Sequence, residues 1–136
     1  LEDVLNTHQR PKFEDYDDYL FIVLKSLLAE DKQQFKVSYE QVSILVMDNF
    51  VFTFKEKTDD ILQPVINRIQ TSKGRLRTLG SDYLAYAILD SIIDQCFTLI
   101  DSLDETIGAL EDELLTEEPT KQTLNTIQKL KREIIT

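Results

Sequence analysis

The sequence is poor in the residues on which many enzymes and disulfide-stabilised proteins depend. It contains one cysteine, one histidine and no tryptophan. The single cysteine, Cys96, cannot form an intramolecular disulfide, which favours a reducing, cytoplasmic setting. A hydrolase of the Ser-His-Asp or Cys-His type needs a histidine held by a third group, and His8 lies in a polar connection close to Pro11. We therefore expect no enzymatic activity and interpret His8 as a turn or packing residue.

Glycine, proline and long apolar runs are also scarce. Three glycines, three prolines and a hydrophobic content of 42% are typical of one globular domain rather than of linkers. The isolated glycines form no phosphate-binding loop, and the sequence has no zinc motif. The longest apolar run, residues 19–24, is much shorter than the roughly 20 residues of a membrane-spanning helix. We expect no transmembrane segment within residues 1–136.

Positive charge is missing from a long part of the chain. The net charge is −10, and every charged residue between Thr78 and Thr120 is acidic. This balance disfavours nucleic acid as a partner. The helical pattern at 80–94 carries Asp82, Asp90 and Asp94 without a neighbouring base. Four environments could compensate the charge of these carboxylates, and all four are left open. They are solvation of an exposed face, a bound cation, the basic segment 68–77, and another subunit.

The spacing of apolar residues predicts an α/β chain. A short helix is expected within residues 1–10 and a strand at about 19–28. Two antiparallel strands, 41–47 and 51–54, are expected to be joined by Asp48 and Asn49, since both residue types tolerate turn conformations. A helix follows from about residue 59, with Pro64 in its first turn and Gly74 as its end.

The remaining sequence predicts two long helices. A seam at heptad spacing indicates a helix that packs along another helix, and after a break at Pro119 a second apolar series offers the partner face for an antiparallel pair. The first series is Leu89, Ile93, Cys96, Ile100, Leu103, Ile107, Leu110 and Leu114, and the second is Leu124, Ile127, Leu130 and Ile134. These patterns start at the first residue and continue to the last, so we expect a piece truncated at both ends.

Oxygen donors are the only metal-binding chemistry that the composition supports. Hard cations such as Mg²⁺ bind carboxylates and keep several waters, and they need neither histidine nor cysteine. The adjacent Glu2 and Asp3 are a candidate half-site at the start of the first helix. Their alternative role is to stabilise the helix N-terminus through its dipole.

Several segments, in order along the whole chain, resemble the cytoplasmic domain of the CorA-type divalent metal-ion transporters. No single segment is specific for this family, but all of them occurring in this order are. They are 1–12 (LEDVLNTHQRPK), 19–25 (YLFIVLK), 40–43 (EQVS), 51–56 (VFTFKE), 74–77 (GRLR), 82–90 (DYLAYAILD) and 130–133 (LKRE).

The resemblance implies a fold and a setting. The expected fold is an α/β (α+β) domain, an α/β/α sandwich with a mainly antiparallel sheet followed by a long helical hairpin. Residues 1–136 are then one cytoplasmic regulatory domain fragment, sheet-rich over 1–57 and helical over 58–136. The family's members transport Mg²⁺, and in some cases Co²⁺ or Ni²⁺, across the inner membrane as homopentamers. Attachment to the membrane would come from segments outside this chain, and no nucleic acid or small organic substrate is expected as a partner.

The resemblance also implies metal residues. Glu2 and Asp3 look like the family's half of a site between subunits, and Asp90 looks like a contributor to a second site nearby. In the family, the facing carboxylate comes from the stalk helix of the adjacent subunit, and bound Mg²⁺ favours the closed state. Two alternatives remain open, namely an oligomerisation scaffold with no metal role and a domain of a zinc-transporting relative.

Overall fold

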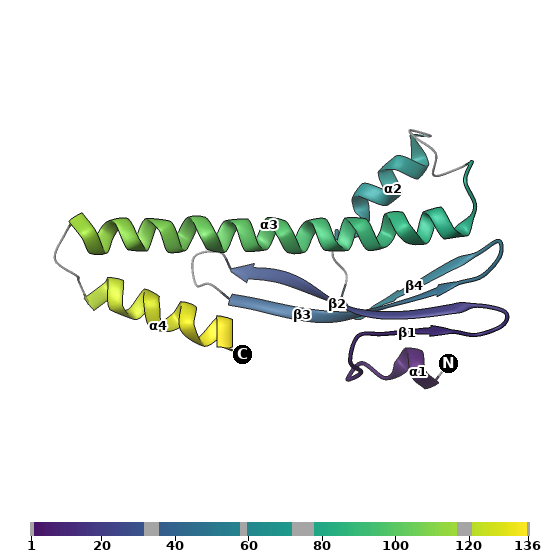
Figure 1. Cartoon of the computed structure of the whole chain (residues 1–136), viewed down its shortest axis with the longest axis horizontal. Helices are drawn as coiled ribbons and strands as arrows, with labels where there is room; N and C mark the ends of the chain where they lie inside the picture. Colours follow the sequence, from purple (N-terminus) through teal and green to yellow (C-terminus); the bar gives the residue numbers. More distant parts are fainter. Residues whose placement is uncertain (1, 32–35, 58–59, 72–77, 117–120, 136) are drawn as a thin grey trace. The chain divides into compact units, whose positions relative to one another are not determined.

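The computed structural model describes residues 2–31, 36–57, 60–71, 78–116 and 121–135 (Figure 1). The chain divides into two compact units, Leu1–Ser26 with Tyr39–Gln95 and Leu27–Ser38 with Cys96–Thr136. Its sheet and helices confirm the expected α/β class. The elements are α1 (Glu2–Leu5), β1 (Lys12–Asp15), β2 (Leu20–Asp31), β3 (Lys36–Val46), β4 (Val51–Lys55), α2 (Gln63–Gln70), α3 (Ser81–Thr116) and α4 (Lys121–Ile135).

The described strands form a four-stranded sheet in the order β1-β2-β3-β4. β1 pairs antiparallel with β2, and β3 pairs antiparallel with β4. The predicted turn at Asp48 and Asn49 is confirmed, because the amide of Met47 donates a hydrogen bond to the carbonyl of Phe50 at 2.8 Å across it. β1 was not predicted, since its four residues contain one large apolar side chain and too little alternation to be recognised.

The core of the first unit lies between one face of the sheet and two helices. Val42, Ile44 and Val46 alternate along β3, so their side chains point to the same face. They form one cluster with Val65 of α2 and with the α3 residues Ala85, Ala87, Ile88 and Ile92. Figure 1 shows α2 and the beginning of α3 on one side of the sheet and α1 on the other. Helices therefore lie on both sides of the sheet, as the expected sandwich requires.

The predicted register of the long helix is wrong in this unit. Ile88 and Ile92 are buried, whereas the predicted seam residue Ile93 is 49% exposed. The face that packs on the sheet is thus one residue earlier than the heptad seam. Ala85 is buried on the same face of the helix as Ile88 and Ile92, so residues 85, 88 and 92 mark the side that meets the core.

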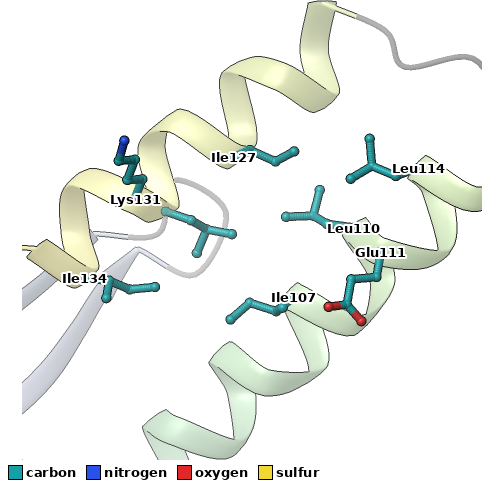
Figure 2. A pocket seen from close by; sticks show the side chains of 8 residues that line it. Ile107, Leu110, Glu111, Leu114, Ile127, Lys131 and Ile134 are labelled. Atoms are coloured by element: carbon teal, nitrogen blue, oxygen red, sulfur yellow. The ribbon is translucent and has the colours of Figure 1, made fainter.

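The second unit contains the predicted helical hairpin. α3 and α4 run antiparallel, and Ile107, Leu110 and Leu114 of α3 face Ile127 and Ile134 of α4 across an apolar groove of about 480 Å³ (Figure 2). The hydroxyl of Thr123 donates to Oε1 of Glu113 at 2.8 Å, which links the two helices near their connection. The apolar spacing that predicted this pair is therefore confirmed for six residues, whereas the predicted Leu124 is 52% exposed and does not line the groove. The six are Ile107, Leu110, Leu114, Ile127, Leu130 and Ile134.

One described helix is long and apolar enough to cross a membrane when only length and composition are considered. It is α3 over Ser81–Leu115, with a mean hydropathy of 1.3 in its most apolar 18-residue window. Core helices of globular proteins meet the same criterion. In this chain Ala85, Ile88 and Ile92 belong to the core of the first unit. That residues 1–136 contain no transmembrane segment stays a prediction.

Two adjacent isoleucines of α3 test which face of the helix supports the fold. We expect Ile92→Ala to lower the free energy of unfolding by about 2–5 kcal/mol, because it opens a cavity in the core. Ile93→Ala, one position along the helix, removes a half-exposed side chain of the same type. Its cost should be below about 1 kcal/mol. Urea unfolding followed by circular dichroism measures the free energy of unfolding of both variants. An equal decrease in the two variants would contradict the described register.

Candidate metal site

Glu2 and Asp3 occupy the first turn of α1, and both are exposed. α1 has four residues, none of them buried. A single helical turn is unstable by itself because nucleation fixes several residues for one hydrogen bond. Its internal bond, from the amide of Asn6 to the carbonyl of Glu2, is 3.2 Å long. Contacts with the rest of the unit must therefore hold the two carboxylates in place.

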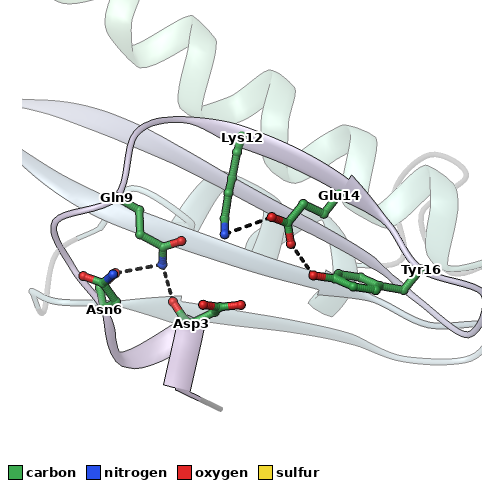
Figure 3. Close-up of polar contacts among 6 residues, drawn as sticks. All are labelled: Asp3, Asn6, Gln9, Lys12, Glu14 and Tyr16. Carbon is green, nitrogen blue, oxygen red and sulfur yellow. Dashed lines mark hydrogen bonds and ion pairs between the residues drawn. The ribbon is translucent and has the colours of Figure 1, made fainter.

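Two glutamines supply those contacts. The side chain of Gln41, on β3, donates from Nε2 to the carbonyl of Asn6 at 2.7 Å and accepts from the amide of Gln9 at 3.3 Å. The side chain of Gln9 in turn donates to the carbonyls of Asn6, at 2.9 Å, and of Asp3 (Figure 3). Carbonyls at the end of a helix lack partners within the helix. The glutamine side chains satisfy the carbonyl of Asp3 in α1 and that of Asn6 directly after it.

A charged network on β1 lies beside α1 (Figure 3). Nζ of Lys12 is 3.1 Å from Oε1 of Glu14, and the hydroxyl of Tyr16 donates a hydrogen bond to Oε2 of Glu14. The bond from Tyr16, followed by that from Lys12, lowers the pKa of Glu14. The same bond to Glu14 is the largest cause that raises the pKa of Tyr16 to about 12, and the charge of Asp3 adds a smaller part. The charge of Asp3 is thus felt at Tyr16.

Sequence reasoning missed Glu14 and Tyr16 because it did not predict β1. Once β1 is known to be a strand, residues 12 and 14 and the following residue 16 are expected on one face, because every second side chain of a strand points the same way. Nζ of Lys12 also lies 5.3 Å from the ring centre of Phe21 on the neighbouring strand. Lys12 and Glu14 are therefore partly enclosed, and Glu14 already has a cationic neighbour.

Asp90 is exposed on α3, well separated in the fold from α1. The sheet lies between them, because Val42 faces α3 whereas its neighbour Gln41 binds the segment that follows α1. One chain thus does not bring Asp3 and Asp90 together. Within the described residues, no three His, Cys, Asp or Glu side chains are grouped closely enough to hold a metal ion. A metal role for Glu2, Asp3 and Asp90 stays a prediction, and it would require ligands from a second chain.

A second concentration of carboxylates was not predicted. It surrounds a cavity of about 150 Å³ where the β1–β2 turn, the β3–β4 turn and the start of α3 meet. The hydroxyl of Ser81 donates to the carbonyl of Asp48 at 3.0 Å and ties two of these segments together. Sequence reasoning singled out Asp82, but its acidic neighbours come from separate segments. The carboxylates that line the cavity are Asp15, Asp17, Asp18, Asp48 and Asp82.

The remaining sequence-based interpretations have different outcomes. His8 is exposed, and its amide donates to Oδ1 of Asn6 at 3.2 Å, as expected of a turn residue. Of the basic segment 68–77, Arg68 lies in the last turn of α2, whereas Lys73, Arg75 and Arg77 are outside the described residues. Compensation of the acidic stretch by this segment stays a prediction.

Comparison with known proteins gives consistent results. The sequence matches the family described as CorA-like Mg²⁺ transporter protein over residues 1–136. It is 42% identical over 135 residues to the cobalt/magnesium transport protein CorA of Thermotoga maritima, covering 99% of this chain and 38% of that protein. The chain therefore spans well under half the length of this relative.

Solved structures show the same fold. The soluble domain of CorA from Methanocaldococcus jannaschii superimposes with a TM-score of 0.76 at 21% identity, covering 98% of this chain and 52% of that one. The complete CorA magnesium transporter of the same organism gives a TM-score of 0.74 at 19% identity, covering 98% and 41%. Because the family match includes every residue of the sequence, the chain belongs to the CorA-like Mg²⁺ transporter proteins.

Proposed function

We propose that this chain is a cytoplasmic, divalent-cation-sensing part of a CorA-type Mg²⁺ transporter of the inner membrane. The match to the family over the whole chain supports this role most directly. The name of the Thermotoga maritima relative adds Co²⁺ as a second ion, and Ni²⁺ belongs to the same class of divalent cargo. The assembly would be a homopentamer attached to the membrane by segments outside this chain. Its work would be transport and its regulation rather than enzymatic catalysis.

The proposed sensor is the pair Glu2 and Asp3, with Asp90 at a second site. Both places present exposed carboxylates, and the described part of the chain supplies neither with a complete set of ligands. Mg²⁺ prefers oxygen ligands and keeps several waters, so an isolated half-site should bind it weakly. A carboxylate from an adjacent subunit would raise the affinity only in the arrangement that brings the subunits together.

Electrostatics gives this arrangement its dependence on Mg²⁺. Two carboxylates 4 Å apart repel by about 4 kcal/mol at an effective dielectric constant of 20. A cation between them converts that repulsion into attraction. Since the attraction exists only when the subunits are close, bound Mg²⁺ shifts the population toward the closed state. Loss of Mg²⁺ from the cytoplasm would then favour opening.

An oligomerisation scaffold without a metal role is the second candidate. The hairpin of α3 and α4 favours it, because Ile107, Leu114 and Ile134 are 37%, 41% and 61% exposed. Exposed apolar residues that share a groove are typical of surfaces that meet a partner. A zinc-transporting relative is less favoured by the candidate ligands themselves, which are carboxylates without histidine or cysteine.

Asp3→Asn tests the proposed sensor, since it removes the charge and keeps the shape of the side chain. We expect about 20 mM Mg²⁺ to raise the melting temperature and the sedimentation coefficient of the wild-type chain. Stabilisation by a bound ion reaches about 1.4 kcal/mol when its concentration is ten times Kd. In Asp3→Asn most of this response should disappear, whereas Asp60→Asn, another exposed aspartate, should keep it. A melting temperature independent of Mg²⁺, together with concentration-dependent association, would favour the scaffold instead.

Asp90→Asn tests whether there are two separate sites. Asp3 and Asp90 lie on different sides of the sheet, so the two substitutions should act independently. We expect each to reduce the Mg²⁺-dependent stabilisation and the double variant to show the sum within about 0.5 kcal/mol. The melting temperatures of the four proteins, measured as Mg²⁺ is added, provide this cycle. A large coupling energy would mean that the two carboxylates share one site.

A further inference from the structure

The position of Glu2 and Asp3 depends on polar contacts rather than on hydrophobic packing. No residue of α1 is buried, so α1 does not insert an anchor into the core. What attaches the end of α1 to the sheet is the carboxamide of Gln41, which is 3% exposed. It contacts the carbonyl of Asn6 and the amide of Gln9, and Gln9 contacts the carbonyl of Asp3.

We propose that Gln41 is the positioning residue of the Asp3 half-site and acts through the side chain of Gln9. This inference rests on the proposed cation-sensing function and adds to it a residue that cannot itself reach the ion. Gln41 fixes the backbone at the end of α1 to strand β3. The first turn, with its two carboxylates, is thereby held in one orientation toward the neighbouring subunit.

The surroundings of Gln41 suit such a role. The backbone amide of Gln41 donates a hydrogen bond to Oε2 of Glu56 at 2.8 Å. Its side-chain Nε2 also lies 3.4 Å from the hydroxyl of Ser43. Next to it, Glu40 accepts a hydrogen bond from the amide of Lys57 at 2.8 Å. The strand is thus tied to the end of β4 at two consecutive residues. Because Gln41 is also buried, its carboxamide is a fixed support for α1.

The carboxamide is chemically specific for these contacts. One planar group presents an acceptor to the amide of Gln9 and a donor to the carbonyl of Asn6. Methionine has a similar size but provides neither a comparable donor nor a comparable acceptor. Without the support, the single turn would populate other conformations, since it has no intrinsic stability. The apparent Kd for a cation rises in inverse proportion to the fraction of molecules in the competent conformation.

The test uses Mn²⁺ as a paramagnetic probe with the oxygen-ligand chemistry of Mg²⁺. In the wild-type chain, we expect Mn²⁺ to broaden the amide NMR signals of residues 2–6 and to give an apparent Kd. Gln41→Met should raise this Kd about 3- to 10-fold. It should also speed the hydrogen exchange of the Asn6 amide, which is bonded to the carbonyl of Glu2. Gln9→Met, at a more accessible position, should change both quantities in the same direction.

Gln95→Met is the matched control. Nε2 of Gln95 donates to the carbonyl of Ile61 at 2.6 Å, so this variant also loses a partly buried bond from a glutamine to the backbone. That bond joins α3 to the segment before α2, away from α1. We expect Gln95→Met to lower the melting temperature and to leave both the Kd and the exchange of Asn6 unchanged.

The outcomes separate this inference from the function on which it rests. If Asp3→Asn abolishes the broadening but Gln41→Met and Gln9→Met bind Mn²⁺ like the wild type, the positioning role is wrong and the sensor remains. If the wild type shows no broadening at residues 2–6, or Asp3→Asn retains it, the Asp3 site is wrong and the positioning role falls with it. Should Gln41→Met fail to fold, Gln9→Met decides the question by the same measurements.

Discussion

The burial of strand β3 on both of its faces is the constraint on which the first unit depends. Residues 40–44 are all buried, although they alternate between the two faces of the sheet. On one face Val42 and Ile44 pack against the helices and supply the hydrophobic core. On the other face Gln41 bonds to the segment after α1. Because a strand cannot shift by one residue without exchanging its faces, the core fixes the register that presents Gln41 to α1.

The distribution of charge follows from the same architecture. Buried carboxylates are costly unless they are paired, and the acidic residues of α3 in this unit, such as Asp82 and Asp90, are exposed. Turns then bring further acids to one end of the sheet, around the cavity that Asp48 and Asp82 line. An acidic surface of this kind attracts cations, and dissolved salt shortens the distance over which the attraction acts.

In the proposed sensor, an incomplete set of ligands would be useful. A complete cage in one chain would bind its ion whatever the neighbouring subunit does. Carboxylates that need a partner couple binding to the approach of subunits, and only such differential affinity can shift a conformational equilibrium. Glu14 on β1 differs in this respect, because Lys12 and Tyr16 of the same chain already hold its carboxylate.

Turn chemistry and apolar spacing are local properties, so the amino-acid sequence was sufficient to predict the class of the fold, the β3–β4 turn and the helical hairpin. Its segments also led to the family, and so to Glu2, Asp3 and Asp90 as candidates. Three features required the folded chain: Ile92 rather than Ile93 meets the core, β1 is a strand, and Gln41 contacts the segment that follows α1. These features depend on which surfaces meet in space, and contacts between residues 35 positions apart, such as Gln41 and Asn6, leave no periodic signal in a single sequence.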